Sequence, residues 1–305
     1  MKRSEAAKLI GAELSRDEAR QKLYAQGLGN FYQEMEMDSP LADSHQDISR
    51  TADHVEQHSH LFFELICCTQ GSLNYLLGTK TFQVQAGDII LIPPGVIHCP
   101  LLPNPVKVPY GRYVIWASTV LVDFFRQTDP GLPDFAHAVV LCTKDTKWEY
   151  LCRFFYAGVQ EAETQAPGWQ TGLAGNTVQL MSHLGRALCD TDTVRSRPKT
   201  NFQEKVLDYI QNNLAHKLSV GETARYFHIS ESTLTHLFHR EMGISFYRCV
   251  TQRRLVEAKR LIGEGRTMEQ VSLAVGFPEY SAFYRAFKSE YGISPQQYRG
   301  MVRPR

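Results

Sequence analysis

Three histidines and one glutamate in the first third of the chain have the residue types and spacing of a ligand-binding site. His58 and His60 are separated by one residue, and Glu64 follows four residues later. On an extended strand, where side chains alternate between two faces, these three project to the same side. If that side lines a barrel, His98 on another strand can converge on them.

Two kinds of chemistry are open to this set. Imidazole nitrogens and a carboxylate can together ligate Zn, Fe, Mn or Ni, so a divalent metal held by His58, His60, Glu64 and His98 is one alternative. The same groups can instead form hydrogen bonds to an organic ligand in a polar pocket that contains no ion. We expect them to bind a small-molecule effector, with no cofactor required.

The elements that must position these residues are short strands. Residues 54–98 alternate apolar and polar side chains between turn signals such as Gly71, Gly87 and Pro93-Pro94-Gly95, a pattern typical of an all-β barrel or sandwich. The spacing from His58 to Gly71 and from Gly87 to His98 resembles the two cupin motifs. The asparagine that often follows the second motif is replaced by Leu102.

A second set of candidate residues lies in a repeat near the C-terminus. Residues 218–245 and 267–294 share one design at an offset of 49 positions, and both end in the same motif, Gly243-Ile-Ser245 and Gly292-Ile-Ser294. Each copy predicts a short helix, a turn and a second helix, with Ser219, Ser230, Ser245 and Thr267 as N-caps.

The second helix of each copy has a buried apolar stripe and an opposite face of short polar, aromatic or basic residues. Such a helix suits insertion into the major groove of DNA, although a small bundle with a solvated face is the alternative. Basic residues from Arg253 to Arg260 in the joining helix are candidates for phosphate contacts or for an ordinary solvated surface. The candidate DNA-binding residues are Ser232, Thr235, His236, His239, Arg240, Tyr280, Ser281, Tyr284, Arg285 and Lys288.

Residues 200–299 resemble the DNA-binding domain of the AraC/XylS family of transcription regulators. The joining helix and the run that begins at Gly276-Phe-Pro-Glu-Tyr-Ser are the most specific part. The resemblance implies a bacterial regulator, usually an activator, often of carbohydrate uptake or catabolism. It places base reading on Ser232, Thr235 and His236 in the first copy and on Ser281, Tyr284 and Arg285 in the second. His236 departs from the longer basic residue frequent in the family.

Composition agrees with a folded, two-part protein. The chain has 305 residues, 43% hydrophobic and 21% charged, and its seven cysteines are scattered. Residues 199–305 contain sixteen Lys and Arg against ten Asp and Glu, which suits a module that binds a polyanion. The absence of a long apolar run and of a secretory leader predicts no membrane partner and a cytoplasmic location.

The expected architecture is α+β and multidomain. It combines an N-terminal cupin-like β-barrel plus two helices with a C-terminal all-α tandem helix-turn-helix domain. The predicted parts are a helix and strap at 1–50, the effector-binding barrel at 51–145, a helical pair at 146–190 favouring dimerisation, a linker at 191–199 and the DNA-binding domain at 200–305.

The predicted function is that of a DNA-binding transcription regulator, an activator controlled by a small-molecule effector such as a carbohydrate. Its expected partners are double-stranded DNA, the effector, RNA polymerase and a second copy of the chain. The rival prediction is a metal-dependent cupin enzyme, an oxygenase or isomerase, with a helical appendage.

Overall fold

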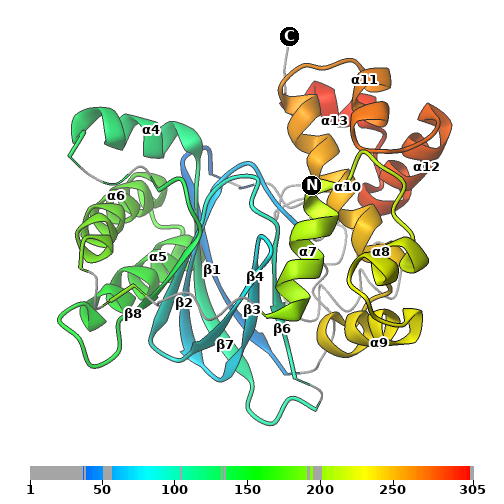
Figure 1. The fold of residues 1–305 in the computed structure, drawn as a ribbon. Helices are drawn as coiled ribbons and strands as arrows, with labels where there is room; N and C mark the ends of the chain where they lie inside the picture. Colours follow the sequence, from blue (N-terminus) through cyan, green and yellow to red (C-terminus); the bar gives the residue numbers. More distant parts are fainter. Residues whose placement is uncertain are drawn as a thin grey trace.

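The computed structural model describes residues 37, 39–50, 57–103, 105–131, 133, 135–190, 193–194 and 201–302. Within these ranges a β-rich N-terminal domain is followed by a helical C-terminal domain (Figure 1). The expected fold class is therefore confirmed. The helix predicted within residues 4–26 and most of the linker at 191–199 lie outside the described residues.

Two antiparallel sheets form the N-terminal domain, with strand orders β1-β7-β2-β5-β8 and β4-β3-β6. The strands are β1 (Ala42–Ser49), β2 (Phe63–Gln70), β3 (Ser72–Leu77), β4 (Lys80–Gln85), β5 (Asp88–Ile92), β6 (His98–Leu101), β7 (Tyr110–Ala117) and β8 (Val139–Cys142). In β2, Leu65 and Cys67 face one apolar cluster, whereas Ile66 and Cys68 face another between the sheets. Burial on both faces explains why β2 is continuously apolar.

Helices cover the outer face of the larger sheet. They are α4 (Thr119–Thr128), the single turn η1 (Glu149–Leu151), α5 (Cys152–Thr164) and α6 (Trp169–Leu188). Phe155 of α5 and Leu180 and Leu184 of α6 share a cluster with β2 and β7. The two helices expected between 146 and 190 are present as α5 and α6, and at least one face of each packs on the sheet.

Two local predictions in this domain were wrong, and one helix was missed. The irregular strap expected over 28–50 contains β1, which pairs with β7 along its whole length. Helix α4 was not predicted, although Ser118 caps it and Leu121, Val122 and Phe125 form its buried stripe. His58 and His60 do not lie on one strand with Glu64, because β2 begins only at Phe63 and His58 forms an isolated bridge with His98.

The C-terminal domain is entirely helical in its described part. Its helices are α7 (Phe202–Asn212), α8 (Val220–Tyr226), α9 (Glu231–Met242), α10 (Phe246–Gly263), α11 (Met268–Ala274), α12 (Tyr280–Tyr291) and α13 (Pro295–Val302). All four predicted caps are confirmed, since Ser219, Ser230, Ser245 and Thr267 each accept a backbone N–H at the start of their helix. Each capped helix begins directly after its cap.

The joining helix α10 connects the two helix-turn-helix units through Arg254. Its Nε donates to the carbonyl of Leu214 at 3.1 Å and its Nη2 to that of His216 at 2.8 Å. Gly276 approaches the same loop with a φ of 80°, and a Cβ there would lie 2.2 Å from the Leu214 oxygen. Only glycine fits this turn, so the second unit can pack closely against the end of α7.

The two domains share one apolar cluster. Leu76 of β3 and Cys99 of β6 pack with Val206, Leu207 and Ile210 of α7. The smaller sheet therefore lies against the helical domain, and the larger sheet lies against α4, α5 and α6 (Figure 1). Within the described ranges, no helix is both long and apolar enough to cross a bilayer.

Candidate DNA interface and effector site

The ten candidate DNA-binding residues all lie on α9 and α12. Nine of them are exposed, and Tyr284 is half-buried. The opposite faces are fully buried, with Leu234 and Phe238 inside the first unit and Phe283 and Phe287 inside the second. Packing of these apolar stripes leaves the polar faces available to a duplex. In Figure 1, α7 and α10 lie between the sheets and these two helices.

The exposed faces of the two helices differ in chemistry. On α9, the hydroxyl oxygens of Ser230 and Ser232 lie 2.8 Å apart, which leaves a short polar surface at the helix start. On α12, Ser281 donates to Glu279 at 3.2 Å, and Arg285 lies exposed one turn further on. Arg285 has the donor geometry for a bidentate contact with guanine, whereas α9 offers mainly short hydroxyls and imidazoles.

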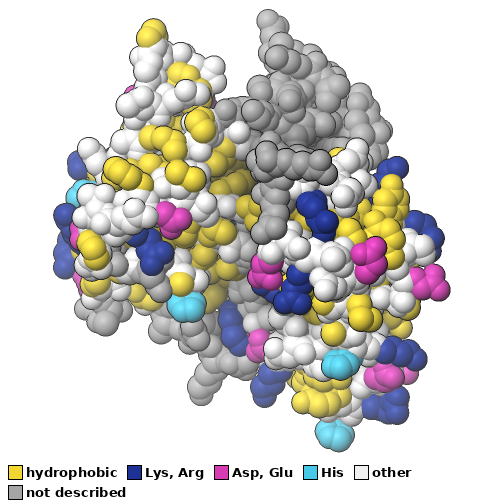
Figure 2. All heavy atoms as spheres, turned by 90° about the horizontal axis from the view of Figure 1, so that it is seen from above, with side chains coloured by type: hydrophobic (Ala, Val, Ile, Leu, Met, Phe, Trp, Pro, Cys, Tyr) yellow, Lys and Arg dark blue, Asp and Glu magenta, His cyan; other side chains and the backbone are white. Residues whose placement is uncertain are grey.

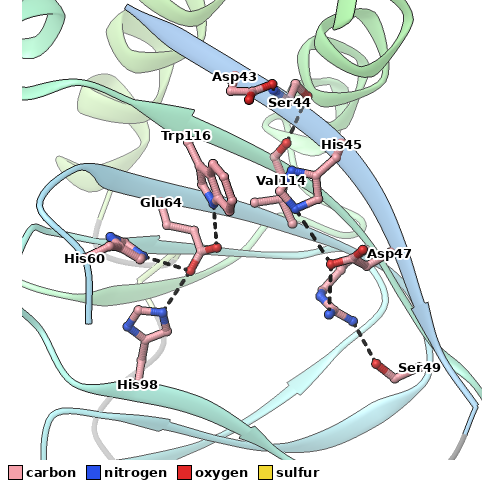
Figure 3. Close-up of polar contacts among 11 residues, drawn as sticks. Asp43, Ser44, His45, Asp47, Ser49, His60, Glu64, His98, Val114 and Trp116 are labelled. Atoms are coloured by element: carbon pink, nitrogen blue, oxygen red, sulfur yellow. Dashed lines mark hydrogen bonds and ion pairs between the residues drawn. The ribbon is translucent and has the colours of Figure 1, made fainter. Parts of the chain in front are cut away.

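The histidines and glutamate predicted as an effector site do converge. We call His58, His60, Glu64 and His98 the His–Glu cluster. Nε2 of His98 lies 2.9 Å and Nε2 of His60 lies 3.4 Å from Oε2 of Glu64 (Figure 3). The rings of His58 and His98 are 4.3 Å apart. β2 contributes Glu64, β6 contributes His98, and the segment before β2 contributes the other two.

Backbone carbonyls fix the tautomers of two histidines in the cluster. Nδ1 of His60 lies 2.8 Å from the oxygen of Phe62, and Nδ1 of His98 lies 2.8 Å from that of Val96. A carbonyl only accepts, so each Nδ1 must carry the proton, and a neutral ring then presents a bare lone pair at Nε2. A proton on Nε2 of either ring would donate to Glu64, and without that proton the ring nitrogen and the carboxylate oxygen are both acceptors.

Burial and hydrogen bonding act oppositely on the charge of the cluster. Burial would raise the pKa of Glu64, but its contacts with His60 and His98 outweigh this and hold that pKa well below the ordinary value. Burial lowers the pKa of His60, and the contact with Glu64 offsets this only in part. The carboxylate of Glu64 is therefore ionised at neutral pH, and its oxygens can accept from a histidine or coordinate a cation.

These donors meet the basic requirement of a metal site. His58, Glu64 and His98 each offer one ligand atom, and the three atoms lie within 4.8 Å of one another. His98 is fully buried, and its Nε2 forms no aligned hydrogen bond despite its proximity to Glu64. Its anchored Nδ1 matches the outer-sphere carbonyl contact that orients metal-bound imidazoles. The cluster fits a divalent transition metal.

Sequence reasoning missed a second polar group on the same sheet. Trp116 of β7 donates from Nε1 to Oε1 of Glu64 at 2.9 Å. Further along, Arg112 donates to Asp47 and to Ser49, each at 3.1 Å, and His45 lies 3.7 Å from Asp47 (Figure 3). Three of these residues belong to β1, the strand that was expected to be irregular. The alternation of Ser49, Asp47 and His45 was the available signal.

Comparison with known proteins assigns both parts of the chain. Residues 45–99 match the family model described as an AraC-like ligand-binding domain, and this range contains the whole His–Glu cluster. Residues 223–301 match one described as a helix-turn-helix domain, and this range contains all ten candidate DNA-binding residues. The N-terminal part of the chain is thus similar to AraC-like ligand-binding domains, and the C-terminal part is similar to helix-turn-helix domains.

Three relatives of this chain are regulators by name. The probable transcriptional regulator LumQ of Photobacterium leiognathi is 36% identical over 97 residues, 32% of this chain and 39% of that protein. The xylose operon regulatory protein of Haemophilus influenzae is 24% identical, with coverage of 50% and 41%. The arabinose operon regulatory protein of Escherichia coli is 26% identical over 235 residues, 72% of this chain and 74% of that protein.

These comparisons favour one of the two functional predictions. The match spans less than half of the first two relatives, and about three quarters of the third. All three relatives are named as regulators, which supports the regulator prediction over the cupin enzyme.

Proposed function

We propose that the chain is a cytoplasmic transcription activator that binds duplex DNA through α9 and α12 and responds to a small polar effector in the N-terminal domain. The observation that carries the proposal is the repeated unit with its polar face exposed. The apolar stripes of α9 and α12 are buried and their polar faces are exposed. Helix α10, through Arg254, holds the two units together. Such units place one helix each in successive major grooves, about 34 Å apart.

The two helices that would read the bases, α9 and α12, are the two reading heads. They contribute unequally to the proposed recognition of DNA. Arg285 supplies guanine readout in the second groove, worth about 1–3 kcal/mol against a wrong base. The hydroxyls of Ser232 and Thr235 and the imidazole of His236 provide weaker readout in the first. Basic residues at the ends of these helices, Arg240 and Lys288, supply phosphate contacts that raise affinity without sequence information.

The effector proposal rests on the His–Glu cluster and its surroundings. The carboxylate of Glu64 as acceptor and the guanidinium of Arg112, which has five N–H donors, suit a ligand with several hydroxyls. Two of the relatives are named for xylose and arabinose operons, which supports a carbohydrate or a related metabolite as the class. A divalent metal held by His58, Glu64 and His98 is the second candidate occupant, because it would neutralise the converging acceptors.

A homodimer and a contact with RNA polymerase complete the proposal. Val120 and Phe124 of α4 are each 67% exposed, and Tyr156 of α5 is 53% exposed. Figure 2 looks onto the side of the molecule where α4 lies and shows hydrophobic side chains gathered over that half. A second copy of the chain is the occupant we propose for this surface. An activator dimer bound upstream of a promoter would then contact the polymerase.

The DNA proposal is tested by selection from a random duplex library, followed by titration of the selected duplex at increasing salt. We expect enrichment of a site with two half-sequences about one helical turn apart, and affinity that falls steeply with salt. Failure to enrich any duplex, or binding that ignores salt, would contradict it.

Occupancy of the cluster is tested separately from DNA binding. The protein is stripped with a chelator, incubated with Zn²⁺, Mn²⁺, Ni²⁺ or Fe²⁺, dialysed and assayed for bound metal. We expect one equivalent in the wild type and loss of that metal in His98→Ala, with retention in the control His236→Ala on α9. A panel of pentoses and hexoses is screened by thermal shift with stripped and loaded protein. Equal metal content in both variants would overturn the metal candidate.

A further inference from the structure

The His–Glu cluster and the helical domain are separated by a single layer of backbone. In β6, His98 belongs to the cluster, while its neighbour Cys99 packs with α7 in the shared apolar cluster. In the segment before β2, His58 and His60 belong to the cluster, while the carbonyl of Ser59 between them accepts from Lys259 of α10 at 2.9 Å. We call residues 57–60 and β6 the shared wall.

The two parts of the wall are bonded to each other. His58 and His98 exchange backbone hydrogen bonds at 2.9 and 3.2 Å, and the carbonyl of His60 accepts from Gly95 at 2.8 Å. A ligand or ion that shifts one histidine must therefore shift the backbone on both sides of Ser59. Because Ser59 is itself 4% exposed, its carbonyl has little room to move independently.

The joining helix is attached to this wall by charged groups that are costly to bury. Lys259 and Arg253 are 3% and 1% exposed. Arg253 donates to the carbonyl of Gly78 at 2.9 Å and to Gln211 at 3.1 Å, so it joins the turn before β4 to α7. A buried cation is stable only while its acceptors stay in place. Displacement of Ser59 would weaken the bond from the Lys259 ammonium and favour separation of the domains.

Two further contacts join the N-terminal domain to the helical domain, one from the wall and one from β4. Gln57 donates to Sγ of Cys249 on α10 at 3.6 Å. Lys80 lies 3.1 Å from Asp208 of α7, at the edge of the interface near Gly78. The helical domain is thus attached at the wall and at the β3–β4 turn, and both attachments reach α7 or α10, which carry the two reading heads.

We infer that Lys259 is a positioning residue through which occupancy of the His–Glu cluster sets the attachment of α10 and thereby the presentation of α9 and α12 to DNA. The inference rests on the proposed occupancy of the cluster for its first step and on the proposed DNA-binding function for its last step. Lys259 and Arg253 thus act within the protein and not on phosphates. Signal transfer by this route needs neither the linker at 191–199 nor the helices α5 and α6.

Native cysteines report the state of this interface. Cys99 and Cys249 are buried beside it, Cys67 is buried in the larger sheet, and Cys189 is exposed. The rate of alkylation of each thiol is measured by mass spectrometry in the wild type, Lys259→Met and Lys259→Arg. Arg260→Met is the matched control, because Arg260 is exposed on the same helix and pairs with Glu257 and Glu264 within it.

We expect Cys99 and Cys249 to react about five-fold faster or more in Lys259→Met, in line with common coupling strengths. Cys67 should stay protected, Lys259→Arg should restore the wild-type rates, and Arg260→Met should match the wild type. Unchanged rates at Cys99 and Cys249 would overturn the inference. Acceleration of Cys67 to the same extent would also overturn it, because the variant would then have lost its fold generally.

A double-mutant cycle tests the coupling itself. Glu64→Gln perturbs the cluster without a ligand. Its effect is measured on the alkylation rates of the thiols and on the affinity for a library-selected duplex. Both measurements are made in the wild-type background and in the Lys259→Met background. We expect an effect of about five-fold or more in the wild-type background, and none in the Lys259→Met background. Equal effects in both backgrounds would refute the route. If no duplex is selected, the DNA proposal fails, while the thiol measurements still decide the inference.

Discussion

Arg248 at the start of α10 and Glu290 near the end of α12 form a two-pronged ion pair. Nη1 lies 2.6 Å from Oε2, and Nη2 donates to Oε1 at 3.1 Å. The Glu290 side chain is 7% exposed and the Arg248 side chain 34% exposed, so one partner is buried and the other reaches the surface. The pair fixes the second reading helix relative to the joining helix.

We predict that Arg248→Met destabilises the domain by about 1.5–3 kcal/mol, because the buried Glu290 carboxylate loses charged donors. The free energy of unfolding in urea measures this change. Arg266→Met is the control, since Arg266 is 53% exposed and lies 3.8 Å from Glu264 at the surface. A loss no larger than that of the control would show that the pair does not hold α12.

The two basic residues on the exposed face of α12 should separate readout from affinity. Arg285→Ala should relax preference at one base pair, by about 1–3 kcal/mol, because a bidentate contact with guanine is lost. Lys288→Ala should weaken all duplexes alike and reduce the salt slope by about one. Sequencing of libraries selected by each variant distinguishes the two. Retained preference at every position in Arg285→Ala would exclude Arg285 from base reading.

His60 should make the metal-free protein less stable as pH falls. Burial lowers the pKa of His60 in the folded state, so the unfolded chain takes up a proton that the folded chain excludes. The stability that His60 contributes is fully present above its pKa in the unfolded chain, about 6.5. That stability is lost as the pH falls below about 6.5 toward the lower pKa of the folded state. The slope contributed by one such group is at most about 1.4 kcal/mol per pH unit.

His60→Gln removes this titration and should flatten the dependence of unfolding free energy on pH between about 7.5 and 5.5. His236→Gln on the exposed face of α9 is the matched substitution outside the cluster. Identical slopes for His60→Gln and the wild type would mean that His60 is protonated equally in both states.

The apolar surface on α4 predicts an effect on assembly. Phe124→Glu should convert a dimer to a monomer in light scattering after size exclusion, because a charge on that surface would have to be desolvated. Val108→Glu changes an exposed apolar residue in the loop before β7 and should leave the mass unchanged. A wild-type protein that is monomeric at high concentration would remove the proposed interface.

The helical domain was predictable because its signals are local. Four hydroxyl caps, two glycines with positive φ at the ends of α9 and α12, and a repeat at fixed offset all lie within a few residues of what they specify. The polar faces of α9 and α12 followed from the 3.6-residue period alone. Convergence of the His–Glu cluster was likewise correct, since the motif spacing fixed which residues could meet.

The incorrect predictions concern contacts distant in sequence. β1 is polar in residues such as Asp47 because its partner Arg112 comes from β7, and that pairing cannot be read from either segment alone. The chain bends between His60 and β2. This bend was not predicted, because a spacing of four residues between His60 and Glu64 also suits a single straight strand. Arg253 and Lys259 looked like surface charges, since their acceptors at Gly78 and Ser59 are backbone carbonyls of another domain.

The shared wall has a consequence for anyone who would convert this protein into a biosensor. Substitutions at His58, His60 or His98 that alter ligand preference would also alter the resting output, because the same peptide units support α10. Retuning for a new analyte should begin instead at Asp47 and Arg112, whose strands β1 and β7 belong to the larger sheet and not to the shared wall.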